Sequence, residues 1–261
     1  MSTAFVTGAS SGIGAKYAER LAARGFDVVL VARNKARLQE SASRLQNTYG
    51  VQAEVLAVDL AEPAGLSEAV SALYKNHAVD FIVNSAGLGP DGPVLQSDET
   101  VLEAMVQLNV VALHQLTLAA VKAFKARGRG TIVNLASVVA LLPEHFNASY
   151  CATKSFVLAL TQGLSAELAD TPIRLQAVLP GLTRTEIFER AGFDINLLDP
   201  NMVMDVGEMV DAALKGLSAG ELVTIPSLPE LEMWHQFTTA RLTMAPFLSL
   251  KNAAARYQSI E

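Results

Sequence analysis

A tyrosine and a lysine stand four residues apart in a stretch of small and aliphatic residues. The stretch reads NASYCATKSF over residues 147–156 and contains Tyr150 and Lys154. On an α-helix, residues four apart project to the same side and differ by about 6 Å along the axis, so the phenol and the ammonium are expected to be neighbours. A nearby ammonium favours the phenolate, which lowers the pKa of a tyrosine from about 10. Although this spacing alone is frequent by chance, the pair predicts a phenol that can act as an acid or a base.

A glycine-rich loop lies close to the start of the sequence. It reads TGASSGIG over residues 7–14 and joins the first candidate strand to the first candidate helix. Glycines allow positive φ and a close approach to a pyrophosphate, and the start of the helix offers N–H groups. No lysine follows the last glycine, which excludes the loop that binds nucleoside triphosphates. The loop predicts a dinucleotide site, with a purely structural turn as the alternative. The predicted contacts are Gly8, Ser10, Ser11, Gly12, Ile13 and Gly14.

The second candidate strand ends on a basic residue, where an acidic one would bind the 2′-hydroxyl of an adenosine ribose. The sequence VLVARNKAR places Arg33 there. A guanidinium suits a 2′-phosphate, so NADP(H) is favoured over NAD(H), unless Arg33 is a solvated loop charge. Lys35 and Arg37 are interpreted as the exposed face of the following helix. Asp59 and Leu60, after the third candidate strand, are predicted to lie at the adenine, with helix capping as the alternative for Asp59.

Composition limits the partners and the compartment. Twenty basic and 26 acidic residues give a charge of −6, which argues against a nucleic-acid partner. The single cysteine, Cys151, excludes an internal disulfide and is typical of a reducing cytosol, and the four histidines show no metal-ligand spacing. The charge-free run 104–121 is shorter than the roughly 20 residues of a membrane span, and a strand begins too early for a signal peptide. We therefore expect a cytoplasmic protein with no metal site and no transmembrane segment.

Short β-branched runs alternate with segments of helical period along the chain. This alternation is typical of βαβ units on a parallel sheet, and no linker divides the 261 residues, so a single α/β domain over 1–261 is expected. The candidate strands are 3–8, 27–31, 53–58, 80–84, 130–136, 173–179 and 221–225.

The glycine loop, NSAG at 84–87, Asn109, Ser137 and the Tyr150–Lys154 pair follow one another in an order that resembles the short-chain dehydrogenase/reductase family. The resemblance covers residues 3 to about 185, in the branch with the TGxxxGxG and YxxxK motifs. It implies a doubly wound, Rossmann-type sheet of seven parallel strands between two layers of helices. It also implies hydride transfer between a nicotinamide and a carbonyl or alcohol.

The resemblance also implies a role for each catalytic residue. Tyr150 is expected to be the proton donor in reduction or the base in oxidation, and Ser137 to hydrogen-bond the same substrate oxygen. Lys154 is expected to bind the nicotinamide ribose and to tune Tyr150. Asn109 is expected to hold a water that relays protons. A capping or packing role would otherwise be the simpler interpretation of Ser137 and Asn109.

Two further segments match the family at the nicotinamide end of the cofactor. Asn84 is expected to brace the sheet, while Ala86 and Gly87 leave room for the cofactor. The segment PGLTRTE at 180–186 is expected to hold the carboxamide through Thr185. Thr183 stands where the family usually has an aliphatic residue, so either threonine remains a candidate. The contacts expected in this segment are Pro180, Gly181, Thr183 and Thr185.

The predicted function is NADPH-dependent reduction of a small carbonyl compound, reversible as an alcohol oxidation. The alternatives are an NAD-linked dehydrogenase of a hydroxylated metabolite or steroid, and a dinucleotide-sensing protein without turnover. A homodimer or homotetramer is expected to form through the helices that carry Asn109 and Tyr150. The substrate site is assigned to residues 138–149, a loop region at about 182–204 and a helical extension at about 227–261, with His145 near the substrate. The apolar stripe of the extension fits a cover for the core or a partner subunit, a substrate lid or a membrane-surface helix.

Overall fold

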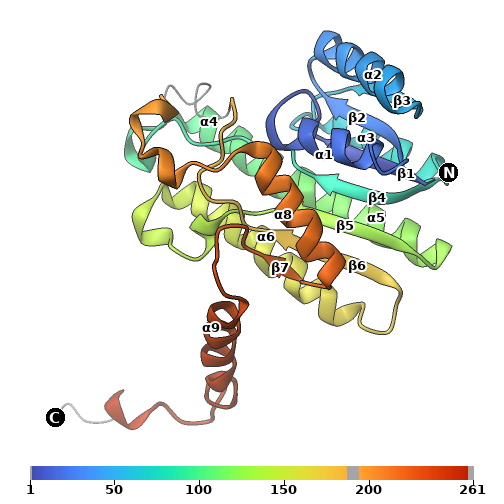
Figure 1. Cartoon of the computed structure of the whole chain (residues 1–261). Helices are drawn as coiled ribbons and strands as arrows, with labels where there is room; N and C mark the ends of the chain where they lie inside the picture. The colour runs from blue at the N-terminus through green and yellow to red at the C-terminus, as the bar shows by residue number, and fades with distance from the viewer. Residues whose placement is uncertain (1, 187–193, 258–261) are drawn as a thin grey trace. The chain divides into compact units, whose positions relative to one another are not determined.

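Seven parallel strands form the centre of the protein in the order β3-β2-β1-β4-β5-β6-β7 (Figure 1). The computed structural model describes residues 2–186 and 194–257. The strands are β1 Thr3–Thr7, β2 Asp27–Ala32, β3 Ala53–Ala57, β4 Val79–Asn84, β5 Gly130–Leu135, β6 Ile173–Val178 and β7 Val223–Thr224. The predicted seven-stranded parallel sheet is confirmed, with strand boundaries within two residues of the expected ones.

The central strands are buried on both faces. All five residues of β1 are buried, as are five of the six residues in each of β4, β5 and β6. Continuous runs of β-branched residues suit strands that helices cover on both sides. The chain order reverses between β1 and β4, so the loops after these two strands open at a topological switch point.

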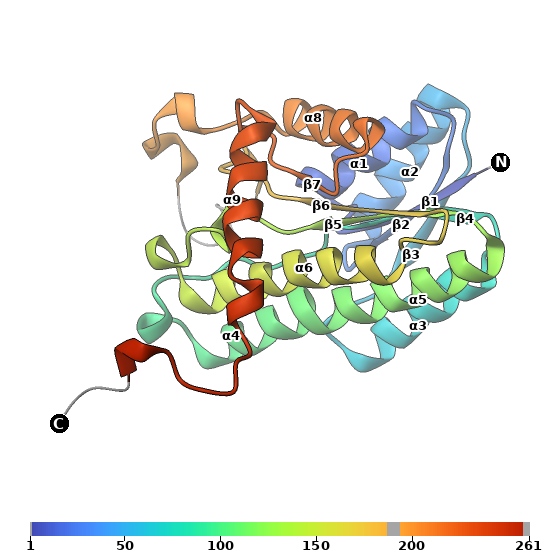
Figure 2. The same cartoon turned by 90° about the horizontal axis from the view of Figure 1, so that it is seen from below.

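Helices cover both faces of this sheet, and Figure 2 shows α1, α2 and α8 on one side and α3, α5 and α6 on the other. One core cluster contains Tyr17, Leu38 and Val210, and the other contains Leu66 and Phe124. This is the expected three-layer α/β/α arrangement. The helices are α1 Gly12–Ala22, α2 Lys35–Tyr49, α3 Pro63–Lys75, α4 Glu99–Val106, α5 Leu113–Arg127, α6 Ala148–Glu167 and α8 Val206–Ala219. Short 3-10 turns are η1 Val94–Gln96, η3 Val138–Ala140, η4 Pro143–His145, η5 Ile195–Leu197 and η6 Pro200–Met202.

A π-helical turn, η2 Gln107–Ala112, joins α4 to α5, so that one helix runs from Glu99 to Arg127. By length and composition, this is the one helix of the described residues that could cross a membrane. Core helices pass the same test, and 44% of its apolar window is buried. Leu116, Ala120 and Phe124 belong to the core cluster on that side of the sheet, which favours a core helix.

The chain divides at Pro226 into two units, Met1–Pro226 and Ser227–Glu261. The sheet and its helices make up the first. The second contains α9 Leu231–Thr243 and the turns η7 Ala245–Phe247 and η8 Ala255–Tyr257. No residue of α9 is buried, and its apolar side chains Leu231, Met233, Phe237 and Leu242 are exposed. A single domain over 1–261 stays a prediction.

Residues 182–204, the expected substrate-loop region, are joined at their two ends. Thr183 and Met204 form an isolated parallel bridge, and the backbone N–H of Met204 donates to the Leu182 carbonyl at 2.9 Å. Residues 187–193 of this region lie outside the described residues. The backbone pairing therefore holds the end of the region beside its start, shortly after β6.

Candidate active site

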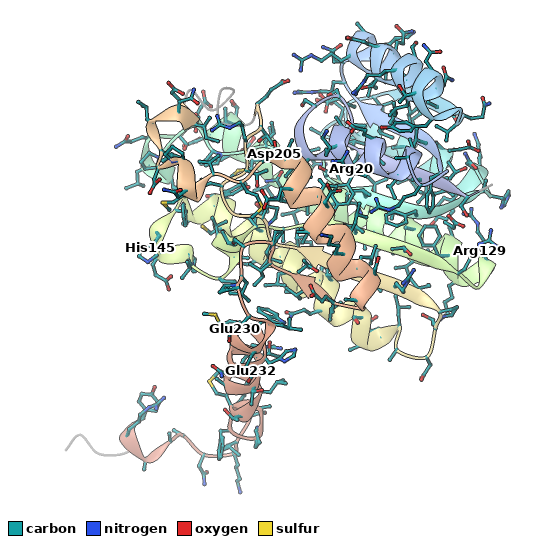
Figure 3. The ribbon with its side chains drawn as sticks, in the orientation of Figure 1. Arg20, Arg129, His145, Asp205, Glu230 and Glu232 are labelled. Atoms are coloured by element: carbon teal, nitrogen blue, oxygen red, sulfur yellow. The ribbon has the colours of Figure 1, made fainter. Side chains whose placement is uncertain are left out.

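The predicted site residues gather at the carboxyl edge of the sheet. Parallel strands bring their carboxyl ends to one edge, so the loops after β1, β4, β5 and β6 meet there. In Figure 3, Arg129 marks the opposite edge, just before β5, while His145 lies beyond the carboxyl end of β5 and is exposed. The fold therefore places the glycine loop, Ala86, Ser137 and Gly181 at neighbouring strand ends.

In the loop after β1, the positions of Gly8 and Gly14 leave no room for a side chain. Gly8 has φ +68°, and a Cβ there would lie 3.0 Å from the backbone of Ala86. A Cβ on Gly14 would lie 2.4 Å from the Gly8 carbonyl oxygen. The first turn of α1 contains no acidic side chain. A backbone that approaches closely at the positive end of a helix fits the pyrophosphate of a dinucleotide.

Thr7 connects the glycine loop to the loop after β4. Its hydroxyl accepts hydrogen bonds from the backbone N–H groups of Ser85 and Ala86, both at 3.0 Å, and donates to the Val83 carbonyl at 3.3 Å. Sequence reasoning missed this role, because a threonine at a strand end carries no signal of its own. Thr7 therefore sets the spacing between the two loops at the switch point.

Buried amides connect β4 to its neighbours below the site. The Asn84 amide donates to Asn134 Oδ1 at 2.9 Å and to Thr117 Oγ1 at 3.1 Å, and the Asn134 amide donates to Thr161 Oγ1 at 3.0 Å. All four residues are at most 2% exposed. This network joins β4, β5, α5 and α6, which gives Asn84 the geometry of a sheet brace.

Two arginines follow β2, one in the loop and one in the first turn of α2, and each faces a carboxylate. Arg33 follows the strand directly, and its Nη1 lies 3.6 Å from Asp59 Oδ2. Asp59 also accepts a hydrogen bond from the Ala61 N–H at 2.9 Å in the turn before α3, but the N-cap of α3 is Glu62, so Asp59 does not cap that helix. Leu60 beside it is buried. Arg37 is not only part of an exposed helix face, because its Nη1 lies 2.7 Å from Glu186 Oε2.

Asn109 lies in the π-helical turn η2 and fastens the loop after β4. Its Oδ1 accepts from the Leu88 N–H and its Nδ2 donates to the Leu88 carbonyl, both at 2.9 Å. A Cβ on Gly87 would lie 3.2 Å from Asn109 Oδ1 and 3.8 Å from Lys154 Nζ, so glycine leaves room between the two side chains. π-turns occur often at functional sites, but a helical period in the sequence does not reveal them.

Tyr150 and Lys154 project from the first turns of α6. The Asn147 side chain accepts a hydrogen bond from the Tyr150 N–H at 2.9 Å and so caps the helix just before the pair. Lys154 Nζ lies 5.6 Å from the centroid of the Tyr150 ring and donates to the Leu135 carbonyl at 3.0 Å. The helical spacing therefore does bring the two side chains together, next to the end of β5.

Burial controls the protonation of both groups. It lowers the pKa of Lys154, which is 7% exposed, from 10.5 to about 8. It raises the pKa of Tyr150 to about 12, with a smaller contribution from Cys151, while a hydrogen bond with Ser137 acts in the opposite direction. Among the protein's own side chains, desolvation therefore moves the pKa of Tyr150 upward, opposite to the lowering expected from a neighbouring ammonium. The phenol is held in its protonated, donating form.

Ser137 and the loop after β6 complete the site. Ser137 Oγ donates to the Pro180 carbonyl at 3.4 Å and is a hydrogen-bond partner of Tyr150. Thr183 is 4% exposed, and its hydroxyl donates to the Gly181 carbonyl at 3.1 Å. Thr185 instead lies against the glycine loop, 3.3 Å from the place of a Cβ on Gly12. The geometry favours Thr185 over Thr183 for a contact with the cofactor.

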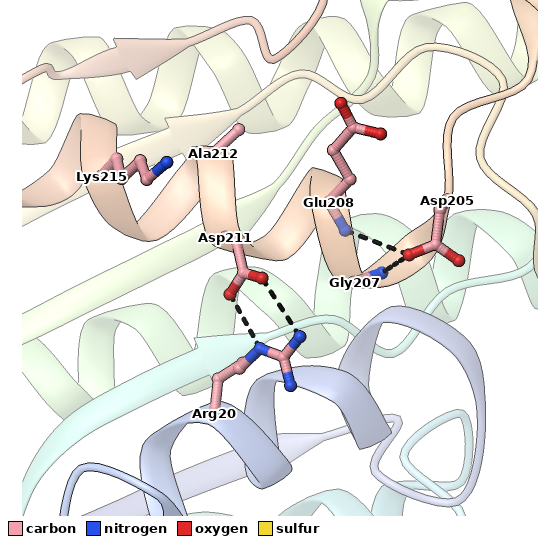
Figure 4. A pocket seen from close by; sticks show the side chains of 7 residues that line it. All are labelled: Arg20, Asp205, Gly207, Glu208, Asp211, Ala212 and Lys215. Atoms are coloured by element: carbon pink, nitrogen blue, oxygen red, sulfur yellow. Dashed lines mark hydrogen bonds and ion pairs between the residues drawn. The ribbon is translucent and has the colours of Figure 1, made fainter.

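A shallow cavity of about 510 Å³ between α1 and α8 is separate from this edge. Figure 4 shows Arg20 forming a two-pronged ion pair with Asp211, at 2.8 and 3.1 Å, and Asp205 capping α8. In the described part of the chain, none of the predicted site residues lines this cavity. Arg20 and Asp211 pair with each other across the two helices, so we interpret the cavity as the joint between α1 and α8.

Comparison with known proteins agrees with the arrangement of the site. The family model described as short chain dehydrogenase matches residues 2–195. The chain belongs to the short-chain dehydrogenase/reductase family. Its sheet order and helical layers are those of the solved family members, and it is an NAD(P)-dependent oxidoreductase of that family.

Two solved members of the short-chain dehydrogenase/reductase family are similar over nearly the whole chain. A short-chain dehydrogenase from Sphingobium yanoikuyae in complex with NADPH is 45% identical, with a TM-score of 0.95 over 98% of this chain and 100% of that one. A bulky-bulky ketone specific alcohol dehydrogenase from Comamonas testosteroni is 41% identical, with a TM-score of 0.91 over 99% of each chain. A diacetyl reductase ((S)-acetoin forming) from Staphylococcus epidermidis is 31% identical over 84% of each chain.

Proposed function

We propose that the protein is an NADPH-dependent carbonyl reductase that also runs in reverse as an alcohol dehydrogenase. The observation that carries this proposal is the grouping of a protonated Tyr150 with Ser137 and Lys154 beside the glycine loop. A phenol and a hydroxyl side by side can donate hydrogen bonds to one carbonyl oxygen. Tyr150 is protonated at neutral pH, so in the reductive direction it has a proton to give to the carbonyl oxygen.

The residues present fit a dinucleotide along the carboxyl edge of the sheet. Gly8, Gly12 and Gly14 provide the close backbone approach, and Arg33 would hold a 2′-phosphate. When bound, the nicotinamide supplies or accepts the hydride. The further contacts proposed for the cofactor are Ser10, Ser11, Ile13, Asp59, Leu60, Asn84, Ala86, Gly87, Tyr150, Lys154, Pro180, Gly181, Thr183 and Thr185.

Proton delivery falls to four side chains. Tyr150 gives its proton to the substrate oxygen while Ser137 donates a hydrogen bond to that oxygen. Lys154 lies over the Tyr150 ring and would bind the nicotinamide ribose, and with a pKa of about 8 it can lose or regain a proton near neutral pH. Asn109 holds the Leu88 backbone beside Lys154 and would place the water that restores the proton.

The preference for NADPH rests on the basic end of β2. Arg33 stands where a 2′-hydroxyl would require a carboxylate, and Arg37 lies one helical turn further on. The Sphingobium relative is complexed with NADPH, as is an L-sorbose reductase from Gluconobacter frateurii that is 26% identical. Replacing Arg33 by aspartate should move the preference from NADPH toward NADH. An unchanged preference would exclude Arg33 as the selector.

For the substrate, we propose a ketone with two bulky substituents, following the Comamonas relative. We also propose a cytoplasmic homodimer or homotetramer. Apolar side chains that are only partly buried, Leu118 and Val121 on α5 and Phe156 and Leu160 on α6, support assembly through these two helices. Light scattering that finds only a monomer would exclude assembly.

The direct test is a panel of aldehydes, small ketones and bulky ketones with NADPH and with NADH, followed by absorbance of the reduced nicotinamide. We expect NADPH oxidation with a bulky ketone and at least a 100-fold loss of kcat in Tyr150→Phe. Full activity in that variant would refute the role of Tyr150. Tight NADPH binding in a calorimeter with no turnover on the whole panel would favour a sensing protein instead.

A further inference from the structure

The Arg37–Glu186 ion pair connects parts of the chain that are far apart in sequence. Arg37 is in the first turn of α2, and Glu186 follows β6 at a separation of 149 residues. The Nη1–Oε2 distance of 2.7 Å is a charge-assisted hydrogen bond, and this bond raises the pKa of Arg37. The pair therefore joins the half of the sheet that contains β2 to the half that contains β6.

The segment that carries Glu186 also carries the residues at the nicotinamide end. Thr185, the residue before Glu186, lies against Gly12 in the glycine loop. The chain from Pro180 to Glu186 thus passes from the carboxyl end of β6 across the glycine loop to the start of α2. A movement of Glu186 would therefore also move Thr185, because the two residues are adjacent in the chain.

The 2′-phosphate of NADP(H) would bind the guanidinium of Arg37, the same group that pairs with Glu186. Arg37 stands in the first turn after Arg33, and its backbone N–H bonds to the Asn34 side chain at 3.0 Å, which fixes its place at the start of α2. A phosphate monoester carries a charge of about −1.5 to −2 and three acceptor oxygens, compared with −1 for a carboxylate. The Arg37 and Glu186 side chains are 46% and 39% exposed, and solvent screens an exposed ion pair, so a phosphate can displace the carboxylate.

We propose that Glu186 is a cofactor-selectivity residue that competes with the 2′-phosphate of NADP(H) for the guanidinium of Arg37. NADPH displaces Glu186 from Arg37, whereas NADH leaves the pair in place. The exchange connects the adenosine end of the cofactor to the segment that carries Thr185. This inference rests on the proposed use of NADP(H), and it assigns to Arg37 and Glu186 a part in the choice of cofactor.

The competition predicts opposite effects of the two partners on NADPH binding. Glu186→Gln keeps the side-chain shape but removes the competing charge, so the NADPH dissociation constant should fall about two- to fivefold. Arg37→Gln should raise it about tenfold, because a charged hydrogen-bond donor to the phosphate is lost. The NADH dissociation constant should change in neither variant. In the double variant, Glu186→Gln should have no further effect, because its competitor for Arg37 is gone.

The experiment is isothermal titration of NADPH, NADH and adenosine 2′-monophosphate into the wild-type protein, the two single variants and the double variant. Glu40→Gln is the matched control, since Glu40 is another acidic group that acts on Arg37 through its charge without a hydrogen bond. Equal tightening in Glu40→Gln, an unchanged NADPH constant in Glu186→Gln, or a Glu186→Gln effect that persists without Arg37 would each overturn the competition.

The wild-type titrations separate this inference from the proposed function. A wild-type protein that binds NADH more tightly than NADPH refutes the proposed cofactor, and the competition with it. A wild-type protein that prefers NADPH and reduces ketones, but whose preference does not respond to Glu186→Gln, refutes the competition alone. Thermal melting of each variant checks that the exposed substitutions leave the fold intact.

Discussion

Replacing Lys154 by methionine is expected to stabilise the protein while it removes the proposed activity. Lys154 is 7% exposed, and burial lowers its pKa from 10.5 to about 8. At 1.36 kcal/mol per pH unit, this difference corresponds to a cost of about 3 kcal/mol for keeping the ammonium charged in the folded protein. Methionine fills a similar volume without a charge, but it leaves the Leu135 carbonyl without its 3.0 Å partner, a loss of about 1–2 kcal/mol. The net expected gain is about 1–2 kcal/mol at pH 7.

The same shift fixes how this gain depends on pH. The folded pKa lies below the unfolded one, so between about pH 8 and pH 10.5 the unfolded chain binds one more proton than the folded chain. The stability of the wild-type protein therefore rises with pH in that window, and its full cost is present only below pH 8. The advantage of Lys154→Met should disappear by about pH 10, because the wild-type lysine is then neutral when folded.

Urea unfolding followed by circular dichroism, at pH 7 and at pH 10 without cofactor, measures both effects. Lys122→Met is the control, since Lys122 is an exposed lysine of α5 and should show no pH-dependent difference from the wild type. If Lys154→Met is less stable than the wild type at pH 7, or if its advantage is the same at both pH values, the reasoning from burial is refuted.

Three further substitutions test other parts of the structure. Ser137→Ala should lower kcat about 100-fold and leave the NADPH dissociation constant unchanged in a fluorescence titration; an equal loss of binding would instead place Ser137 in the cofactor site. Thr117→Val should lower the free energy of unfolding in urea by about 1–3 kcal/mol, because the buried Asn84 amide loses its 3.1 Å acceptor; an unchanged midpoint would contradict a stabilising network. Gly12→Ala should weaken NADPH binding in calorimetry at least tenfold, because φ is +54° and the new Cβ meets Thr185 at 3.3 Å; wild-type affinity would show that the loop adapts.

The fold was accessible from the sequence because it depends on local patterns. β-branched runs predicted the seven strands, and all of these strands except β3 are largely buried. The neighbouring positions of Tyr150 and Lys154 followed from helical spacing alone. The sequence did not reveal that the pKa of Tyr150 is raised, because this shift depends on how many atoms from other elements surround the phenol.

The sequence also did not predict contacts between segments that are far apart in the chain. Arg37 looked like a surface residue of a helix, since no local pattern shows a partner 149 residues away. The hydroxyl of Thr7 and the π-turn around Asn109 were missed for a related reason. Their roles come from backbone groups of the β4 loop, which sequence patterns do not describe.

The two ends of the proposed cofactor site differ in how deeply their charged and polar side chains are buried. At the catalytic end, Asn109 and Lys154 are 1% and 7% exposed, and each is held by backbone groups at about 3 Å. Proton transfer depends on positions fixed to a fraction of an ångström, so burial is favoured there despite the cost of a charged lysine. At the adenosine end, the Arg33 and Arg37 side chains are 65% and 46% exposed, and solvent screens their ion pairs. Weak, exposed pairs can exchange one anion for another at little cost, which is what a choice between two cofactors that differ by one phosphate requires.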